Sequence, residues 1–566
     1  MPTTGNSLQP SNLGAHTTRG PHTGSVPAGW AATATQAFNL SNASDLGALA
    51  ASKTITVRLG LQMRSPDQLA SLVAGGQQIS PSTFNATYAP TQTQVSAATA
   101  YLQSHGFSNI AVEPNNLLIS ATGTAAQASQ AFNTTLHAFS QNGTTVFANV
   151  TPAYVPQNLG GNVIAVLGLS NAPTMKPTPK FAPTPCSVEG VTTPRPVCLR
   201  FYDPATFNVT YDAASLPTAS STPVAIMAEG TVSQSITDFR TNEQEFALPH
   251  VPVNVVQVGL QSTDTSGDGE WTLDMTYSSG MAGNLSTIYL YDTTSLTDSD
   301  IALEYNRWVT QDLTHIANSS FGGCDYGPYL DGSMVVDDEI LLEGAAQGQT
   351  MFVSTGDSGS FCSVGLPNGV PAGEPFVEYP AASPYVVAVG GTDLFSNADG
   401  TYKGESAWEA GGGGVSQFEY SPYWEAGEQR QAKNGLNDRG LPDIAMDAAL
   451  ETGALLWGGS AVNGSCTPCI TGGTSLASPL AAGAYARMQT AHGNALGFAP
   501  PYFYTNYGEH RSNNPALAGP PTTNSIGGFH DILVGSNGLY TALPRYDFTT
   551  GLGSFDIATM NAQIGQ

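Results

Sequence analysis

The segment GGTSLASPLAAG places Ser475 between a glycine-rich turn and an apolar, alanine-rich stretch that predicts a helix. A serine at the start of a helix lies near free backbone N–H groups and the positive end of the helix dipole, which stabilise an alkoxide or an oxyanion. The segment therefore indicates a nucleophilic serine. Taken alone, it leaves open the alternative that Ser475 only caps the helix.

A nucleophilic serine needs a base, and the nine histidines are poor candidates because most lie in the N-terminal part of the chain or beside turns. The segment GDGEWTLDMTYSSG offers carboxylates instead. Glu270 and Asp274 are spaced i, i+4, so on a helix they share one face. Two carboxyls so close share a proton at acidic pH, which suits a general base and its orienting partner. A solvated helix face is the alternative, although apolar neighbours such as Trp271 argue against it.

Asp357 follows an apolar strand pattern in FVSTGDSGSFC, at the carboxyl end of the strand, where catalytic groups of parallel sheets gather. Two other interpretations fit less well. A chymotrypsin-type GDSG would make Ser358 the nucleophile, but the Gly-Pro that should follow is absent. A pepsin-type site would need a second Asp-Thr/Ser-Gly loop, and the segment 264–267 does not match one.

The elements that must position these residues divide the chain into four parts. Residues 201–566 alternate apolar, β-branched runs with helical patterns, which predicts an α/β domain with a parallel sheet covered by helices on both faces. Residues 51–171 predict a compact α+β unit of the split β-α-β type, with a hairpin turned at Asn142-Gly143. The Pro-rich residues 172–200 predict an extended linker open to proteolysis, and residues 1–50 a poorly ordered arm.

The composition excludes several classes of protein. The chain has 43 Asp+Glu against 17 Lys+Arg, a formal net charge of -26, and no basic run that could track nucleic-acid phosphates. No segment is apolar enough to span a bilayer. Only 11% of residues are charged, so neutral polar groups cover the surface, which favours work at acidic pH where salt bridges would be lost. An ordinary secreted protein with a Thr/Asn-rich surface is the alternative.

The cysteines and sequons favour an extracellular protein. The six cysteines form three sequence-local pairs that suggest disulfides: Cys186 with Cys198, Cys324 with Cys362, and Cys466 with Cys469. The last pair lacks the further ligands that a zinc site would need. Nine N-x-S/T sequons point the same way: Asn42, Asn85, Asn133, Asn142, Asn149, Asn208, Asn284, Asn318 and Asn463. We expect secretion into an acidic environment, with a signal peptide not visible in residues 1–30.

In order and rough spacing, Glu270 and Asp274 in E-x-x-x-D, Asp357 in S-x-G-D-S-G and Ser475 in G-G-T-S-x-A-S-P resemble the motifs of the sedolisins, the serine-carboxyl peptidases. The phrases GTAAQASQAFNTTLH and VPQNLGGNVIAVLGLSN resemble the inhibitory prodomain of that family. The resemblance implies a subtilisin-like catalytic domain preceded by a ferredoxin-like prodomain.

The resemblance also implies roles. Ser475 would attack the scissile carbonyl, Glu270 would accept its proton, and Asp274 would support Glu270. Protonated Asp357 would donate a hydrogen bond to the tetrahedral oxyanion. Because a carboxyl group donates only when neutral, such a site would work best at low pH, where a histidine base would be fully protonated.

The segment FHDILVGSNGLYTALPRYDFTTGLGSFD resembles the family's calcium loop. By this match Ca²⁺ would be bound by the carboxylates of Asp531 and Asp547 and by the backbone carbonyls of Ile532, Leu543 and Arg545. The family usually has glycine where Leu543 and Arg545 stand. An acidic surface loop is the alternative.

Glu229, at the end of the strand pattern PVAIMAEG, matches a family carboxyl that extends the hydrogen-bond network behind the base. The usual tryptophan partner is replaced by Phe321, which cannot donate a hydrogen bond. We therefore expect this extension to be cut or mediated by water.

The leading hypothesis is a secreted, acid-acting endopeptidase that hydrolyses proteins or peptides and is made as a zymogen, with its own prodomain as an intramolecular inhibitor. Ionised carboxylates between prodomain and catalytic domain would hold the two together at neutral pH, and acid would weaken the contact and allow self-processing within the linker. A non-catalytic secreted or cell-surface protein that kept the fold is the alternative, favoured by the sequons.

Overall fold

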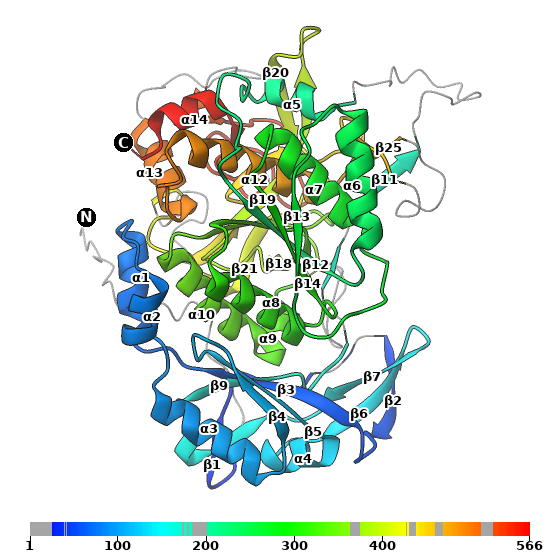
Figure 1. The fold of residues 1–566 in the computed structure, drawn as a ribbon, viewed down its shortest axis with the longest axis vertical. Coiled ribbons are helices and arrows are strands. Elements are labelled where there is room, and N and C mark those ends of the chain that lie inside the picture. Colours follow the sequence, from blue (N-terminus) through cyan, green and yellow to red (C-terminus); the bar gives the residue numbers. More distant parts are fainter. Residues whose placement is uncertain are drawn as a thin grey trace, which may run out of the picture.

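Figure 1 shows the computed structural model, with a smaller N-terminal unit in blue and cyan below a larger unit in green to red. The structure describes the following residues: 25–38, 40, 42–172, 175–177, 180–183, 201–362, 374–425, 427–429, 437–458, 468–510 and 525–565. Within these ranges, no helix is long and apolar enough to cross a membrane.

A four-stranded antiparallel sheet forms the centre of the N-terminal unit. Its strand order is β4 (Ser108–Val112), β5 (Leu118–Thr124), β3 (Thr54–Leu61) and β9 (Val163–Leu167). In chain order this is the 2-3-1-4 arrangement of a ferredoxin-like fold, as the sequence predicts. Helices α3 (Gln92–Ser104) and α4 (Ala125–Ala131) lie beside this sheet in Figure 1, and each begins with the capping box that its Thr and Gln predict.

The predicted hairpin is present as β6 (Leu136–Gln141) and β7 (Thr144–Asn149), and Asn142 and Gly143 both have positive φ, as a type I′ turn requires. Residues 1–24 of the expected arm lie outside the described residues, and the described part of residues 25–50 is more ordered than the sequence predicts. Ala43–Ala48 forms β2, which pairs with β6, and Trp30–Ala32 forms β1, which pairs with β8 (Tyr154–Pro156). These strands form because Phe38 and Leu40 are buried in a small cluster with residues of the hairpin.

The larger unit is built on an eight-stranded sheet that is parallel except for one strand at its edge. Its main path is β13 (Val253–Gln257), β14 (Ile288–Thr293), β12 (Val224–Glu229), β15 (Ile316–Ser319), β17 (Thr350–Ser354), β19 (Val387–Ser396) and the antiparallel β20 (Tyr402–Ala407); β23 (Ile444–Asp447) also pairs with β19. Strands β12, β15, β17 and β23 are buried along their whole length, which explains why such strands read as continuous apolar runs.

Helices cover both faces of this sheet (Figure 1). One face carries α6 (Ser233–Glu245), α7 (Asp268–Ala282) and α12 (Thr474–Ala491). The other carries α8 (Asp298–Gln311) and α10 (Ser333–Ala346), and the N-terminal unit packs against these two helices. The predicted three-layer α/β domain is therefore confirmed.

The contact between the two units is polar at its edges. Arg58 forms an ion pair with Asp300 at 2.9 Å, and Arg307 forms a longer one with Glu113 at 3.5 Å. Two carboxyls of α10 also accept hydrogen bonds from the N-terminal unit. Glu339 accepts from the Met63 N–H at 2.8 Å, and Glu343 accepts from the Asn115 amide at 2.7 Å.

Candidate active site

Helices α7 and α12 bring together the three residues that the sequence places in a catalytic group. Glu270 and Asp274 lie in the first half of α7, and Ser475 is the second residue of α12. All three side chains are buried. The N-cap of α12 is Gly473, with φ 95°, and no side chain caps the helix, so Ser475 is not the capping residue.

The two helices approach closely at Gly483. A Cβ atom at this position would overlap the Ser278 carbonyl oxygen of α7 and would lie 2.9 Å from the Met281 Cβ. Glycine therefore allows α12 to pack directly on the backbone of α7. This contact fixes the distance between the helix that carries Ser475 and the helix that carries the two carboxyls.

A chain of hydrogen bonds holds Asp274. The Ser320 hydroxyl donates to Asp274 Oδ1 at 2.7 Å, and the Asn318 amide donates to that hydroxyl at 3.0 Å. On α12, the Ser478 hydroxyl donates to Asn318 Oδ1 at 2.6 Å. No motif in the sequence points to these three residues, although Ser320 follows the carboxyl end of β15. Asn318 lies in an N-x-S sequon, but its side chain is fully buried.

The pKa of Glu270 is raised well above its usual range, first by burial and then by the charge of Asp274, with a further increase from Asp357. Burial also raises the pKa of Asp274, and hydrogen bonds from Ser320 and Asn318 oppose this shift. The Ser475 hydroxyl is close enough to Glu270 to lower its pKa somewhat. This contact does not have the geometry of a hydrogen bond. Neither Glu270 oxygen has a hydrogen-bond partner among the described residues.

Asp357 lies on the turn after β17, next to the start of α12. The Thr474 N–H and hydroxyl both donate to Asp357 Oδ1, at 2.8 and 3.0 Å, and the Gly356 N–H donates to the Thr474 hydroxyl at 3.0 Å. Asp357 is thus tied to the residue directly before Ser475. A carboxyl placed here can act on an oxyanion formed at Ser475.

The described histidines lie elsewhere. His250 is 73% exposed and contacts Glu243, and His530 stacks on Tyr402. Among the described residues, the hydrogen-bond partner of the Ser475 hydroxyl is the Ser320 carbonyl, at 3.5 Å. The structure therefore places carboxyls, and no described histidine, beside Ser475.

Glu229 lies at the end of β12 and is not joined to Glu270 or Asp274 by a hydrogen bond within the described chain. Its pKa is raised to about 7 by burial and then by the charges of Asp264, Asp292 and Asp268. The Trp271 indole donates to the Glu229 backbone carbonyl at 2.9 Å and meets the Phe321 ring edge-on. Phe321 therefore packs beside this region without extending the network, as its chemistry predicts.

The five residues of the expected calcium loop lie on neighbouring turns. Asp531 accepts from the Arg545 N–H at 2.9 Å, and Asp547 accepts from the Leu543 N–H at 2.9 Å. Both carboxyls and Ile532 are buried. Arg545 has φ 75°, a conformation that favours glycine, which explains why the family pattern has glycine there.

The expected ligand set contains two carboxylates, those of Asp531 and Asp547. No group of three or more His, Cys, Asp or Glu side chains suited to a metal occurs in the described ranges. The expected calcium site would have two carboxylates and three backbone carbonyls, so it does not require three acidic side chains. Two buried, mutually repelling carboxylates fit a hard dication that prefers oxygen ligands.

The linker passes on both sides of Ser475. Lys176–Pro177 forms β10, which pairs antiparallel with β16 (Phe321–Cys324), the strand that follows Ser320. Lys180–Pro183 forms β11, which pairs antiparallel with β25 (Cys469–Gly472), the strand that leads into Ser475. The described linker residues 176–177 and 180–183 are extended, and the catalytic unit supplies the strands that pair with them.

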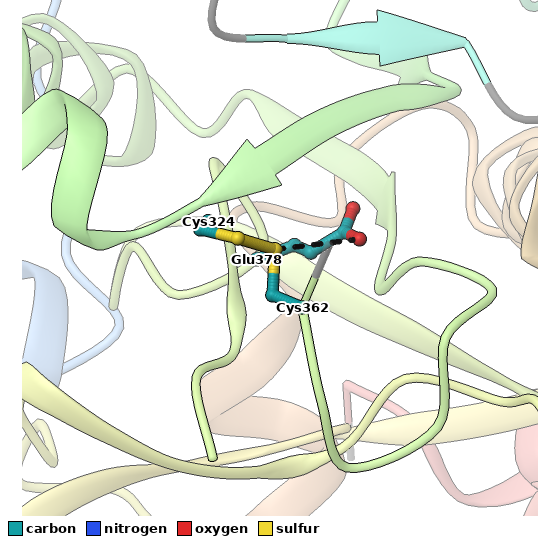
Figure 2. The surroundings of a disulfide bond; sticks show 3 residues. All are labelled: Cys324, Cys362 and Glu378. Atoms are coloured by element: carbon teal, nitrogen blue, oxygen red, sulfur yellow. Dashed lines mark hydrogen bonds between the residues drawn. A yellow bond between two sulfur atoms is a disulfide. The ribbon is translucent and has the colours of Figure 1, made fainter. Parts of the chain in front are cut away.

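The predicted disulfide between Cys324 and Cys362 is present (Figure 2), and Cys469 is also disulfide-bonded. Cys186, Cys198 and Cys466 lie outside the described residues.

Both units match known protein families. Residues 41–172 match the family described as "Pro-kumamolisin, activation domain", and residues 257–506 match the subtilase family. The chain is 35% identical to sedolisin from Pseudomonas sp. (strain 101), over 94% of this chain and 92% of that protein. It is 36% identical to xanthomonalisin from Xanthomonas sp. (strain T-22), over 91% of this chain and 66% of that protein.

A solved structure agrees with these matches. Pseudomonas sedolisin, described as a serine-carboxyl proteinase complexed with two molecules of pseudo-iodotyrostatin, has a TM-score of 0.56 and 34% identity to this chain. The match covers 64% of this chain and 98% of that structure.

An activation domain packed on a subtilisin-like α/β domain, with a buried serine at the start of a helix, defines a serine peptidase made with a prodomain. The chain belongs to the sedolisin family. It is accordingly a serine-type peptidase, and the alternative of a non-catalytic surface protein is not supported.

Proposed function

We propose that this chain is an acid-acting, self-processing serine-carboxyl endopeptidase in which Ser475 is the nucleophile and Glu270 its base. The observation that carries the proposal is the surroundings of Glu270. Burial raises its pKa, and so do Asp274, one helical turn away, and Asp357, far away in the sequence, whereas the distant Ser475 lowers it. A raised pKa makes the ionised form of Glu270 a stronger base for the Ser475 proton.

Asp357 supplies the second part of the mechanism. The negative charge that develops on the carbonyl oxygen of the substrate needs a hydrogen-bond donor, and a carboxyl is a donor only when protonated. Thr474 holds Asp357 beside Ser475 through two hydrogen bonds to Oδ1. The proposed dependence on acid follows from this requirement for a proton on Asp357.

The path of the linker supports the proposed zymogen. Strands β10 and β11 occupy the edges of β16 and β25, on either side of Ser475, where an extended substrate would bind. A chain held there excludes other substrates. It also places the linker, rather than a folded domain, within reach of Ser475.

Acid would act on the contact between the two units in two opposing ways. The pairs of Arg58 with Asp300 and of Arg307 with Glu113 require charged carboxylates, so acid removes them. The sequence predicts that carboxylates in this contact are ionised at neutral pH. Glu339 and Glu343 differ, because burial in the contact raises the pKa of each to about 8. A group whose pKa rises on docking favours docking at low pH, so we assign acid release to the two ion pairs.

We further propose that Asp531 and Asp547, with the carbonyls of Ile532, Leu543 and Arg545, hold Ca²⁺. The bound ion would supply positive charge between the two carboxylates and hold the C-terminal turns together. We also propose an extracellular, acidic place of work, on the low charged fraction of the chain and its disulfides.

The direct test is covalent labelling of Ser475 at about pH 4 by a serine-reactive phosphonate, located by mass spectrometry of the modified peptide. We expect labelling of Ser475 in the wild type and none in Glu270→Ala. Equal labelling of both proteins would contradict the role of Glu270.

A further inference from the structure

Glu378 is a carboxyl beside the candidate site that the proposed mechanism does not use. It begins strand β18 (Glu378–Tyr379), which pairs with β16 so that Glu378 lies opposite Cys324. Figure 2 shows its side chain next to the disulfide that joins Cys324 to Cys362. Cys324 belongs to the strand that pairs with the linker, and Cys362 follows the Asp357 turn.

Two glycines make room for the Glu378 carboxyl. A Cβ atom on Gly356, the residue before Asp357, would overlap this carboxyl. A Cβ atom on Gly322 would lie 2.8 Å from Glu378 Oε2. Gly322 is the β16 residue opposite Lys176 of the linker. One carboxyl therefore lies against both the Asp357 turn and the strand along which a substrate would bind.

This carboxyl is neutral over a wide pH range. Glu378 is 5% exposed, and burial, followed by the charge of Asp357, raises its pKa to about 8. Its Oε1 lies 4.0 Å from Cys362 Sγ. Because a disulfide sulfur has no proton to donate, a hydrogen bond across this contact requires the proton to be on Glu378.

Other titratable groups on the surrounding elements point elsewhere. Asp325, at the end of β16, accepts a hydrogen bond from Ser416 at 2.9 Å. The Tyr379 hydroxyl approaches Asp338 of α10 at 3.3 Å. Within the described chain, Asp357 is therefore the charged group that acts on Glu378.

We propose that Glu378 is a positioning residue whose neutral carboxyl holds the Gly356–Asp357 turn against strand β16, and that loss of its proton separates the two. The inference rests on the proposed role of Asp357. Ionised Glu378 would be a second buried negative charge beside Asp357, with no described cation to offset it. The turn would move away from β16, and the oxyanion donor would move with it.

The test compares Glu378→Gln and Glu378→Ala with the wild type as self-processed enzymes. Gln keeps the shape and the donor but cannot ionise. At about pH 4 we expect Glu378→Gln to keep most of its kcat/KM and Glu378→Ala to lose about tenfold or more, mainly in kcat. After incubation at about pH 8 and return to acid, we expect Glu378→Gln to retain several times more activity than the wild type.

Asp325→Asn is the matched control, because burial within the catalytic unit raises the pKa of Asp325 to about 7, but its carboxyl accepts from Ser416 and does not lie against the Asp357 turn. The control should decay at the wild-type rate. Equal decay of Glu378→Gln and the wild type would overturn the proposal, even if Glu378→Ala failed to fold. Full activity of Asp357→Ala would instead reject the oxyanion role, so the two failures are distinguishable.

Discussion

At the scale of single residues, a catalytic carboxyl needs a partner that sets its pKa and another that fixes its orientation. Burial and then the charge of Asp274 raise the pKa of Glu270, and the Ser320 hydroxyl fixes the orientation of Asp274. Ser478 and Asn318 connect this pair back to the helix that carries Ser475. One connected set of hydrogen bonds therefore ties Asp274, the neighbour of Glu270, to the helix that carries Ser475.

Replacing Ser475 or Glu270 by Ala should lower kcat by about three orders of magnitude or more, because each substitution removes a group that acts in the chemical step. Activity at acidic pH and circular dichroism of the same samples check this result. His250→Ala is the control, because His250 is 73% exposed and contacts Glu243 instead of Ser475. A Glu270→Ala enzyme with more than about a tenth of wild-type turnover would rule out this base.

Asp357→Ala should cost about 3 kcal/mol in transition-state stabilisation, or roughly a hundredfold in kcat, because it removes the proposed oxyanion donor. Asp357→Asn keeps an N–H donor that cannot ionise. The variant should therefore retain more activity than Asp357→Ala, and its kcat should fall less steeply as the pH rises. Pre-steady-state kinetics across the pH range measure both effects, and equal activities of Asp357→Ala and wild type would exclude the role.

The sequence points to the proposed catalytic residues because each lies in a short motif with its own local signal. It does not predict Ser320, Asn318, Ser478 or Glu378, because their importance comes from contacts between segments far apart in the chain. Ser320 and Asn318 bear on Asp274 only when β15 lies beside α7, and Glu378 bears on Asp357 only when β18 pairs with β16.

At the scale of elements, the site depends on how closely α7 and α12 pack. Gly483 removes the side chain that would separate them. The strands and helices of the central sheet are predicted from the sequence because their apolar periodicity is local. Strands β1 and β2 are not predicted from the sequence, since their pairing partners lie roughly 90 or more residues later in the chain.

Gly483→Val should lower kcat by about tenfold or more and destabilise the protein by roughly 1–3 kcal/mol, because overpacking moves α12 away from the Glu270–Asp274 pair. Activity and denaturant unfolding measure the two effects. Gly508→Ala in α13 (Ala499–His510) is the control, because a Cβ there would meet its nearest neighbour at an ordinary 3.5 Å. If Gly483→Val were as active as Gly508→Ala, the spacing of the helices would not matter.

At the scale of the whole molecule, the prodomain, the linker and the catalytic domain form one regulated unit. The full chain should be inactive at neutral pH and should shorten itself by roughly a third at about pH 4, with cleavage in the linker. A Ser475→Ala chain should stay at full length under the same conditions. Gel electrophoresis and N-terminal sequencing check this outcome, and equally rapid trimming of purified Ser475→Ala would mean that another protease performs maturation.

The buried carboxyls also predict how stability depends on pH. The pKa values of Glu339, Glu343 and Glu378 are raised to about 8, and that of Asp325 to about 7, in each case first by burial. A carboxyl whose pKa is higher in the folded than in the unfolded protein stabilises the fold while it is protonated. This stabilisation is fully present below the pKa of the unfolded chain, near 4.5 for Glu, and is lost as the pH rises through the pKa of the folded protein.

The free energy of unfolding of Ser475→Ala should therefore fall by several kcal/mol between about pH 4.5 and pH 8. Each carboxyl contributes at most about 1.4 kcal/mol per unit of its pKa shift. Urea unfolding at a series of pH values measures it. The ion pairs Arg58–Asp300 and Arg307–Glu113 act in the opposite sense but are partly exposed, so their contribution is smaller. Stability that rises towards pH 8 would contradict this account.

Calcium removal gives a further whole-molecule prediction. If Asp531 and Asp547 hold Ca²⁺, chelation should lower the melting temperature of Ser475→Ala, and added Ca²⁺ should restore it. Asp547→Asn should melt at a lower temperature than the parent and should respond little to chelation. An unchanged melting temperature of the parent after exhaustive chelation would exclude the site.

The pairing of the linker with β16 and β25 also bears on which proteins this peptidase can digest. When β10 and β11 leave, two open strand edges remain on either side of Ser475, and both bind main chain. A polypeptide can occupy both edges only when several consecutive residues are fully extended, which a compact native protein does not offer. The rate of digestion should therefore be limited by the unfolding of the substrate protein. The acid that would release the linker from the enzyme would also unfold its substrates.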